Sequence, residues 1–293
     1  MKIAAIDIGS NAIRLLIEEV REHQGQWRID KVSLTRVPVR LGDEVFVHKK
    51  ISDEKLRQLV KTMRAFWYLM DVHQVEMFRV CGTSAMREAK NKNKVIETVE
   101  REANFKIEVL SGEEEAELIF KNYFAQNLSN KGNYLYLDVG GGSTEITLIR
   151  KGKRIKGQSF NIGTVRSLTG ATDETVWVDI KKYLSTLTKN PTKLIAIGTG
   201  GNVNTLFKIQ GKKPNELVSL NELKGLQKAL APLTVDERIF NYKLRPDRAD
   251  VILPACDIYI KILQLANIKE MLVPKIGLSD GMILDMIGQI KKV

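Results

Sequence analysis

The stretch of sequence that decides the fold is residues 134–149, YLYLDVGGGSTEITLI. Here an apolar run ends in an acid, Asp138, a turn of three glycines follows, and a second apolar run leaves the turn. Short apolar runs bounded by glycine are typical of buried strands joined in a hairpin. The beginning of the chain has the same plan, because residues 3–11, IAAIDIGSN, place Asp7 at the end of a strand and a turn at Gly9.

Asp138 follows Asp7 by 131 residues, so one unit of strand, acid, glycine turn and strand occurs twice. This repeat predicts two lobes with similar cores, whose acidic turns face each other. A third glycine loop, GTGGN at residues 198–202, follows an apolar strand at 194–197 and precedes apolar residues at helical spacing. A strand, a glycine loop and a helix start can together bind an anion.

Composition narrows the class of protein. The 293 residues predict two domains, and a hydrophobic fraction of 43% is enough to build real cores. A net charge of +11 favours anionic partners such as nucleic acid, anionic lipid or polyphosphate. We expect no specific nucleic-acid binding, because the sequence has neither zinc-finger spacing nor an RNA-binding aromatic signature. With two cysteines, no signal peptide and no run of about 18 apolar residues, we expect a cytoplasmic protein without a membrane span.

Helical patterns occupy most of the remaining chain. The predicted helix at residues 52–70 begins with Ser52, a plausible N-cap. The one at residues 111–125 begins with a capping box made by Ser111 and Glu114. Further helices are predicted around 219–231, 248–266 and 279–291. The turn-rich residues 127–133 mark the domain boundary, which predicts an N-terminal lobe at 1–126 and a C-terminal lobe at 127–293. The last helix, at about 279–293, can pack back on the first lobe.

Asp7 and Asp138 are either polar strand ends or metal ligands. A carboxylate in this position can hold Mg²⁺ directly or through water, and the adjacent turn offers backbone N–H groups to phosphate oxygens. Residues 140–143 match neither a Walker loop nor a dinucleotide fingerprint, because no lysine follows the glycines and a strand leaves them. A plain hairpin turn is the alternative reading.

Two further groups are candidates for chemistry. Glu113, Glu114 and Glu115 stand at a helix start, where acids complement the helix dipole, but one of them could also orient an attacking water as a general base. Arg87 follows a strand-like run and a small-residue loop, and it either contacts phosphate or faces solvent. The three histidines are scattered and receive no role.

The motifs occur in the order found in the exopolyphosphatase/guanosine-pentaphosphate phosphatase family, which the chain resembles from residue 3 to about 287. The segments that carry the resemblance are IDIGSN (6–11), CGTSAMR (81–87), LSGEEEA (110–116), LDVGGGSTE (137–145), GTVR (163–166), GTGG (198–201) and RAD (248–250).

The resemblance implies a two-lobed actin-like ATPase fold, of the sugar kinase–Hsp70–actin and ribonuclease H-like type, with a cleft between the lobes. It implies Mg²⁺-dependent removal of terminal phosphates from polyphosphate or guanosine pentaphosphate, other divalent cations being possible, and a homodimer. Catalytic roles fall to Glu115, Asp138 and Glu145, and metal binding to Asp7, Asp138 and Glu115. The implied phosphate contacts are Gly9, Ser10, Asn11, Arg87, Gly140, Gly141, Gly142, Ser143, Gly198, Thr199 and Gly200.

Departures from the family pattern leave alternatives open. Glu117 stands where arginine is common, and Ala12 where serine or threonine is common. A non-catalytic regulator that binds guanosine polyphosphates is therefore a second hypothesis. A small-molecule kinase on the same fold is a third, because the loop at 198–201 could serve a nucleotide. The sequence does not rank polyphosphate against guanosine pentaphosphate.

Overall fold

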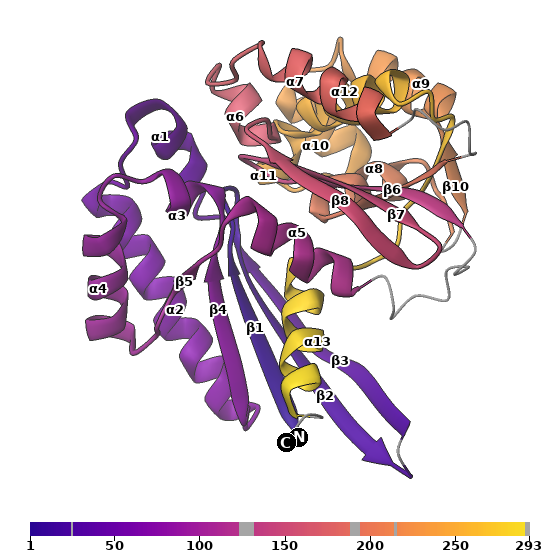
Figure 1. The fold of residues 1–293 in the computed structure, drawn as a ribbon. Coiled ribbons are helices and arrows are strands. Elements are labelled where there is room, and N and C mark those ends of the chain that lie inside the picture. Colours follow the sequence, from indigo (N-terminus) through magenta and orange to yellow (C-terminus); the bar gives the residue numbers. More distant parts are fainter. Residues whose placement is uncertain (25, 123–131, 188–193, 214–215, 291–293) are drawn as a thin grey trace. The chain divides into compact units, whose positions relative to one another are not determined.

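The computed structural model describes residues 1–24, 26–122, 132–187, 194–213 and 216–290 (Figure 1). The chain divides into two compact units, one made of residues 1–122 together with the chain from Leu278 onward, the other of residues 123–277. The boundary that the sequence analysis expects near residue 127 lies outside the described residues. None of the helices in the described ranges is long and apolar enough to cross a membrane.

The first unit contains a five-stranded mixed sheet in the order β3-β2-β1-β4-β5. Its strands are β1 (Lys2–Ile8), β2 (Ile13–His23), β3 (Gln26–Val37), β4 (Met77–Gly82) and β5 (Glu108–Val109). β1 pairs antiparallel with β2 and parallel with β4, so the hairpin predicted around Gly9 is present. Because β1 is central, almost its whole length is buried, which explains its unbroken apolar sequence.

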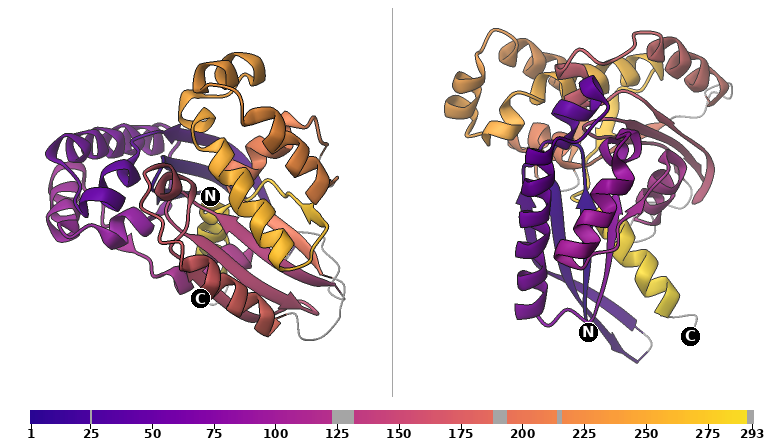
Figure 2. Two further views of the ribbon diagram at one scale, coloured as in Figure 1. Left: turned by 90° about the horizontal axis from the view of Figure 1, so that it is seen from above. Right: turned by 90° about the vertical axis from the view of Figure 1, so that its left-hand side faces the viewer.

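Helices cover both faces of this sheet, with α2 on one face and α13 on the other (Figure 2). The helices are α1 (Leu41–His48), α2 (Asp53–Val72), α3 (Ser84–Glu88), α4 (Lys92–Ala103), α5 (Gly112–Lys121) and α13 (Leu278–Ile290). The Ser52 side chain accepts a hydrogen bond from Lys55 N, which confirms the predicted N-cap of α2. The predicted capping box of α5 is also present, although the helix ends at Lys121, and residues 123–125 lie outside the described part.

The second unit contains a six-stranded mixed sheet in the order β10-β11-β9-β6-β7-β8. Its strands are β6 (Asn133–Val139), β7 (Thr144–Arg150), β8 (Lys153–Phe160), β9 (Ile195–Thr199), β10 (Leu217–Ser219) and β11 (Glu270–Leu272). Its helices are α6 (Thr164–Leu168), α7 (Val176–Leu187), α8 (Gly201–Ile209), α9 (Leu220–Leu230), α10 (Val235–Tyr242), α11 (Pro246–Ala249) and α12 (Ile252–Leu265).

One expected helix is two helices. The sequence analysis predicts a single helix at 248–266, whereas the chain forms the short α11 and then α12. Pro246 starts α11 at its first position, and Pro254 lies in the first turn of α12, where no intrahelical N–H bond is lost. Two prolines therefore mark two helix starts, and the helix predicted around 248–266 is present as α12, while residues 248 and 249 belong to α11.

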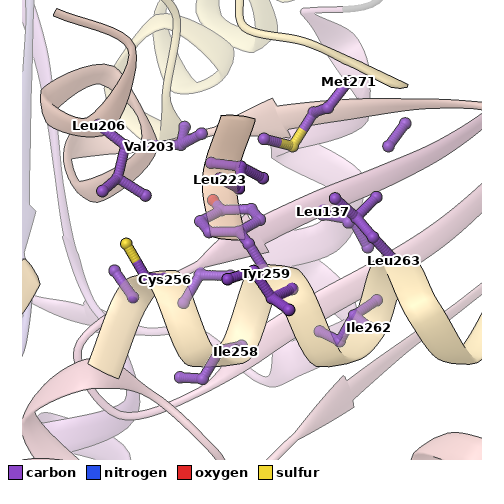
Figure 3. Close-up of a cluster of buried hydrophobic side chains, with 14 of the residues drawn as sticks. Leu137, Val203, Leu206, Leu223, Cys256, Ile258, Tyr259, Ile262, Leu263 and Met271 are labelled. Atoms are coloured by element: carbon purple, nitrogen blue, oxygen red, sulfur yellow. The ribbon is translucent and has the colours of Figure 1, made fainter. Parts of the chain in front are cut away.

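The core of the second unit is built on α12, whose side chains Cys256, Ile258, Tyr259, Ile262 and Leu263 are buried (Figure 3). The Tyr259 ring lies among residues from the sheet and from other helices, and its hydroxyl donates to the carbonyl of Thr199 at 3.0 Å. This bond ties the core helix to the end of β9, where the third glycine loop begins.

The five strands of the first sheet have counterparts in the same order in the second, which has β10 in addition. In each, a first strand ending in an acid pairs antiparallel with the next strand and parallel with a later one, as β1 does with β2 and β4, and β6 with β7 and β9. Even the turn bonds match, because Gly9 N donates to the Ala12 carbonyl and Gly140 N to the Ser143 carbonyl. The repeat predicted from Asp7 and Asp138 is therefore a repeat of structure.

Candidate functional site

In the first unit, residues outside the hairpin form hydrogen bonds to the turn between β1 and β2. Gly42 N donates to the Ser10 carbonyl at 2.8 Å, and Arg40 N donates to the Asn11 carbonyl at 3.0 Å. A Cβ atom on Gly9 would lie 2.9 Å from the Ala12 carbonyl oxygen, so this position has no room for a side chain. Because α1 occupies its carbonyls, the turn is a fixed platform for Ser10 and Asn11, both of which are buried.

A second loop, at the end of β4, meets this turn. β1 and β4 are parallel with Ile8 opposite Gly82, so both strands end at the same edge of the sheet. The Ser10 and Ser84 hydroxyls lie 2.8 Å apart, and Thr83 N donates to the Ile8 carbonyl. Two hydroxyl groups from distant parts of the sequence are thereby brought together beside Asp7.

Asp7 is a buried carboxylate with one oxygen engaged. Its Oδ2 accepts a hydrogen bond from Arg14 at 2.9 Å, while Oδ1 has no hydrogen-bond partner among the described residues. Burial raises the pKa of Asp7 above its usual value, and the positive charges of Arg14 and Arg36 oppose this shift. A buried carboxylate oxygen without a donor is suited to a cation, which meets the chemical requirement for a metal ligand.

The triple acid at the start of α5 separates into distinct roles. Glu114 bonds to Ser111 in the capping box, and these bonds lower its pKa, whereas Glu113 is exposed. Glu115 is only 8% exposed. Arg87 lies beside it, since Nη1 donates to the Leu110 carbonyl at 2.6 Å and lies 3.4 Å from Glu115 Oε2. The structure thus brings together Arg87 and Glu115, two residues that the sequence analysis singled out separately, whereas Glu117 faces solvent.

In the second unit, the carbonyls of the triple-glycine turn are all occupied. Thr164 N donates to Gly140 O, Val165 N to Gly141 O, and the Arg166 side chain to Gly142 O, at 2.7–3.0 Å. The contact is so close that a Cβ on Gly163 would lie 2.5 Å from Gly142 N.

The N–H groups of this turn differ from its carbonyls in their hydrogen bonding. Within the described residues, the N–H groups of Gly141 and Gly142 donate to no acceptor. A turn whose carbonyls are satisfied and whose amides remain available is suited to an anion.

Two acids stand beside this turn. Asp138 and Glu145 are directly opposite each other across β6 and β7, so their side chains share one face of the sheet. Glu145 accepts hydrogen bonds from the hydroxyls of Ser143 and Ser159, both at 2.8 Å. A Cβ on Gly200, which has φ +90°, would lie 2.5 Å from Asp138 Oδ1, so the third glycine loop closes against this carboxylate.

The other two residues predicted in the third loop have packing positions. A Cβ on Gly198 would meet Met271 Sδ at 2.6 Å, and Thr199 is fully buried. Their phosphate contacts remain predictions. In the parallel pairing of β6 with β9, Thr199 lies opposite Asp138, the acid against which Gly200 also packs.

Three buried polar residues, to which the sequence analysis gave no role, brace the turn. Asn202 donates through Nδ2 to the Val139 carbonyl at 3.1 Å and accepts from Arg248 at 2.6 Å, while Arg166 holds Gly142. Arg166 and Arg248 belong to quoted motifs, so a signal for them existed. No local pattern, however, tells that Arg248 reaches Asn202, because 46 residues separate them.

Comparison with known proteins shows which family this chain is similar to. Residues 16–290 match the Ppx/GppA phosphatase family. A guanosine-5'-triphosphate,3'-diphosphate pyrophosphatase from Vibrio cholerae is 27% identical over 99% of this chain and 60% of its own length. A bifunctional 3-dehydroquinate synthase/phosphatase from Fusobacterium nucleatum is 35% identical over 56% of this chain and 25% of its own length. The chain thus spans 60% and 25% of the length of these two relatives.

Solved structures give the same assignment. An exopolyphosphatase from Cytophaga hutchinsonii is 26% identical, with a TM-score of 0.84 over 99% of this chain and 98% of that one. A family member from Aquifex aeolicus is 25% identical, with a TM-score of 0.76 over the same shares. Two sheets with corresponding strands, each with an acid before a glycine turn, are the actin-like ATPase fold. The chain belongs to the Ppx/GppA phosphatase family.

Proposed function

We propose that this chain hydrolyses the terminal phosphoanhydride bonds of inorganic polyphosphate, of guanosine pentaphosphate, or of both, and releases orthophosphate. The observation that carries the proposal is the buried carboxylate of Glu115 next to the guanidinium of Arg87. A carboxylate can orient or deprotonate the attacking water, and a guanidinium can stabilise charge on the transferred phosphate. The names of the relatives from Vibrio cholerae and Cytophaga hutchinsonii support these two substrate classes.

Each unit offers a half-site for phosphate, the turn after β1 with Arg87 in the first unit and the triple-glycine turn in the second. The amides of Gly141 and Gly142 would donate hydrogen bonds to phosphate oxygens, and the Arg87 guanidinium would donate to phosphate oxygens in the same way. Ser10 and Asn11 add polar groups at the first turn. Most of the rate enhancement would come from orientation of the bond to be cleaved and from charge stabilisation.

The chemical step is an in-line displacement at phosphorus. The oxygen of a water molecule forms a bond to the terminal phosphorus, and the bridging P–O bond breaks, with its electron pair passing to the leaving phosphate. Glu115 takes the proton of the water at a carboxylate oxygen. The products are orthophosphate and a substrate shorter by one phosphate, so atoms and charge balance.

We propose Mg²⁺ as the cofactor, held by Asp7, Asp138 and Glu115, with other divalent cations as possible substitutes. The described residues contain no group of three or more His, Cys, Asp or Glu side chains that could hold a metal. Mg²⁺ usually keeps several waters and also binds phosphate oxygens, so these acids would not need to form a closed cage. The ion would neutralise phosphate charge, and the unpartnered Asp7 Oδ1 fits this role.

A phosphate-release assay tests the proposal. Purified protein is incubated with tripolyphosphate, long-chain polyphosphate, guanosine pentaphosphate and ATP, each with Mg²⁺ and with excess EDTA. We expect orthophosphate from at least one of the first three, and none with EDTA. Tight binding without release would support the non-catalytic regulator instead, and ATP-dependent phosphorylation of a small acceptor would support the kinase. A homodimer and a cytoplasmic location remain predictions.

A further inference from the structure

The edge of the second sheet carries an unusual charge distribution. From Ile146 to Thr172 the sequence contains no aspartate or glutamate, whereas it contains Arg150, Lys151, Lys153, Arg154, Lys156 and Arg166. All but Arg166 lie on the hairpin of β7 and β8. Within the described residues, β8 is the outermost strand of its sheet and pairs only with β7. Lys151, Lys153 and Lys156 are exposed along it.

Protection of the edge does not account for all these charges. A lysine on an edge strand commonly prevents pairing with another chain, but this does not explain a lysine in the turn. The hairpin turn, however, also holds a lysine at an unfavourable position. Lys151 has φ +50° and Gly152 φ +73°, the conformation of a two-residue turn that favours asparagine or aspartate first. A cation therefore stands at the tip despite a backbone preference for other residues.

The cationic strand leads directly to the candidate site of the same unit. β8 runs from the tip to Phe160, which pairs with Thr144 just beyond the triple-glycine turn. Ser159, one residue earlier, donates to Glu145. At about 3.3 Å per residue, Lys151 and Ser159 are roughly 26 Å apart along the strand. A ligand that follows the lysines would have to be a long, flexible chain.

The chemistry of the strand indicates a polyanion without bases. Single-stranded nucleic acid is usually held by aromatic side chains that stack on its bases. β8 exposes lysines, Ile155 and Gln158, but its one aromatic residue, Phe160, is buried. Nearby Tyr183 is also buried, under the ammonium group of Lys156 at 5.1 Å. The surface thus offers charge without a stacking platform.

We propose that the exposed lysines of β8 and its turn form an exosite for the distal phosphates of a polyphosphate chain whose end lies at the triple-glycine turn. This inference rests on the proposed function, and it deepens it by favouring long polyphosphate over a nucleotide. Guanosine pentaphosphate is too short to reach from the turn to Lys151.

The test compares two triple variants that remove equal charge. In the exosite variant, Lys151→Asn is combined with Lys153→Gln and Lys156→Gln, and the asparagine suits the turn, which protects folding. In the control variant, Lys61→Gln, Lys106→Gln and Lys224→Gln remove three exposed lysines scattered over α2, the segment before β5, and α9. Binding of long-chain polyphosphate, tripolyphosphate and single-stranded RNA is measured by fluorescence anisotropy in EDTA, over a series of salt concentrations.

We expect the exosite variant to lose at least ~10-fold in affinity for long-chain polyphosphate, with a shallower salt dependence, because fewer counterions are released. Its affinity for tripolyphosphate should change by less than about twofold, and the control variant should resemble the parent. An equal loss in the control variant, or an equal loss for tripolyphosphate, would overturn the exosite. RNA that binds as tightly as polyphosphate, and depends on the same lysines, would overturn the choice of ligand.

The binding measurement needs no turnover, so the two proposals fail separately. If the parent protein releases no phosphate but the exosite variant binds long-chain polyphosphate more weakly, the exosite is supported and the proposed hydrolysis is overturned. Unchanged binding in a protein that hydrolyses polyphosphate would remove the exosite alone.

Discussion

Arg14 and Glu145 stand at the same position of the repeated strand unit and carry opposite charges. Arg14 lies directly across the strand pair from Asp7, and Glu145 lies directly across from Asp138. Asp7 therefore forms a salt bridge of 2.9 Å with Arg14, whereas Asp138 has a second acid, Glu145, as its cross-strand neighbour. The two half-sites therefore have the same backbone arrangement but different electrostatics.

Arg14 should stabilise the first half-site through Asp7. Replacing Arg14 with Met leaves a buried carboxylate without its cation, and we expect a loss of about 2–4 kcal/mol in the free energy of unfolding. Urea denaturation measures this. Asp7→Asn in the same background should recover part of the loss, because it removes the uncompensated charge. An Arg14→Met variant as stable as the parent would contradict the pairing.

Glu115 should be the acid of α5 on which turnover depends. Glu115→Gln keeps the size of the side chain but removes the base, and we expect turnover to fall at least ~100-fold. The matched control is Glu114→Gln, since glutamine can replace glutamate in a capping box. Steady-state phosphate release compares the two, and near-parental turnover in the first variant would transfer the role of base to another group.

Gly163 should be needed for the shape of the anion turn. An added Cβ would lie 2.5 Å from backbone atoms of Gly141 and Gly142, so Gly163→Ala must push the turn away from α6. We expect a loss of about 1–3 kcal/mol in stability and weaker phosphate binding. Gly225→Ala is the control, because open space surrounds this helical glycine and the change should stabilise the fold by roughly 0.5–1 kcal/mol.

Gly281 should hold α13 against the helix that carries Glu115. The glycine packs so closely on the Leu118 carbonyl of α5 that a methyl group has no room. Gly281→Ala should therefore displace α5, cost about 1–3 kcal/mol and reduce turnover. Gly288→Ala, in the same helix but in open space, should leave turnover unchanged and stabilise the fold by roughly 0.5–1 kcal/mol. Thermal unfolding and phosphate release of the two variants decide the matter, and equal behaviour would argue against the packing.

Glu18 should make stability depend on pH. Burial, followed by the nearby charge of Asp280, raises its pKa to about 7, although Lys31 opposes the shift. The folded protein therefore holds this proton where the unfolded chain, with a value near 4.5, has lost it. Stability conferred by the group falls as the pH rises from about 4.5 to 7, and the full cost applies above that range.

Glu18→Gln removes this titration. We expect a flatter dependence of stability on pH and a gain of roughly 2 kcal/mol at pH 8, with little change below pH 4.5. Urea midpoints at several pH values measure both effects. A variant that loses stability at pH 8 would show that the carboxylate is well compensated in the folded state.

Much of the architecture could be predicted because it depends on local chemistry. Apolar runs that end in Asp7 and Asp138 and break at glycine specify buried strands and turns. Ser52 and the Ser111–Glu114 box specify helix starts that the structure confirms. The exposed strand β8 escaped prediction, since its run of lysines and arginines lacks the apolar signal on which strand prediction relies.

The local sequence determined the strands, turns and helix caps of this protein. The spacing of apolar residues and the cap and turn residues involve only a few neighbouring positions. The partnership of Arg87 with Glu115, the reach of Arg248 to Asn202, and the closure of Gly200 on Asp138 arise only when the chain folds. These contacts join residues 28 to 62 positions apart, and sheet register and helix packing set their distances, which no local pattern encodes. The sequence showed which residues were candidates, but only the packing of the folded chain decided which of them are in contact.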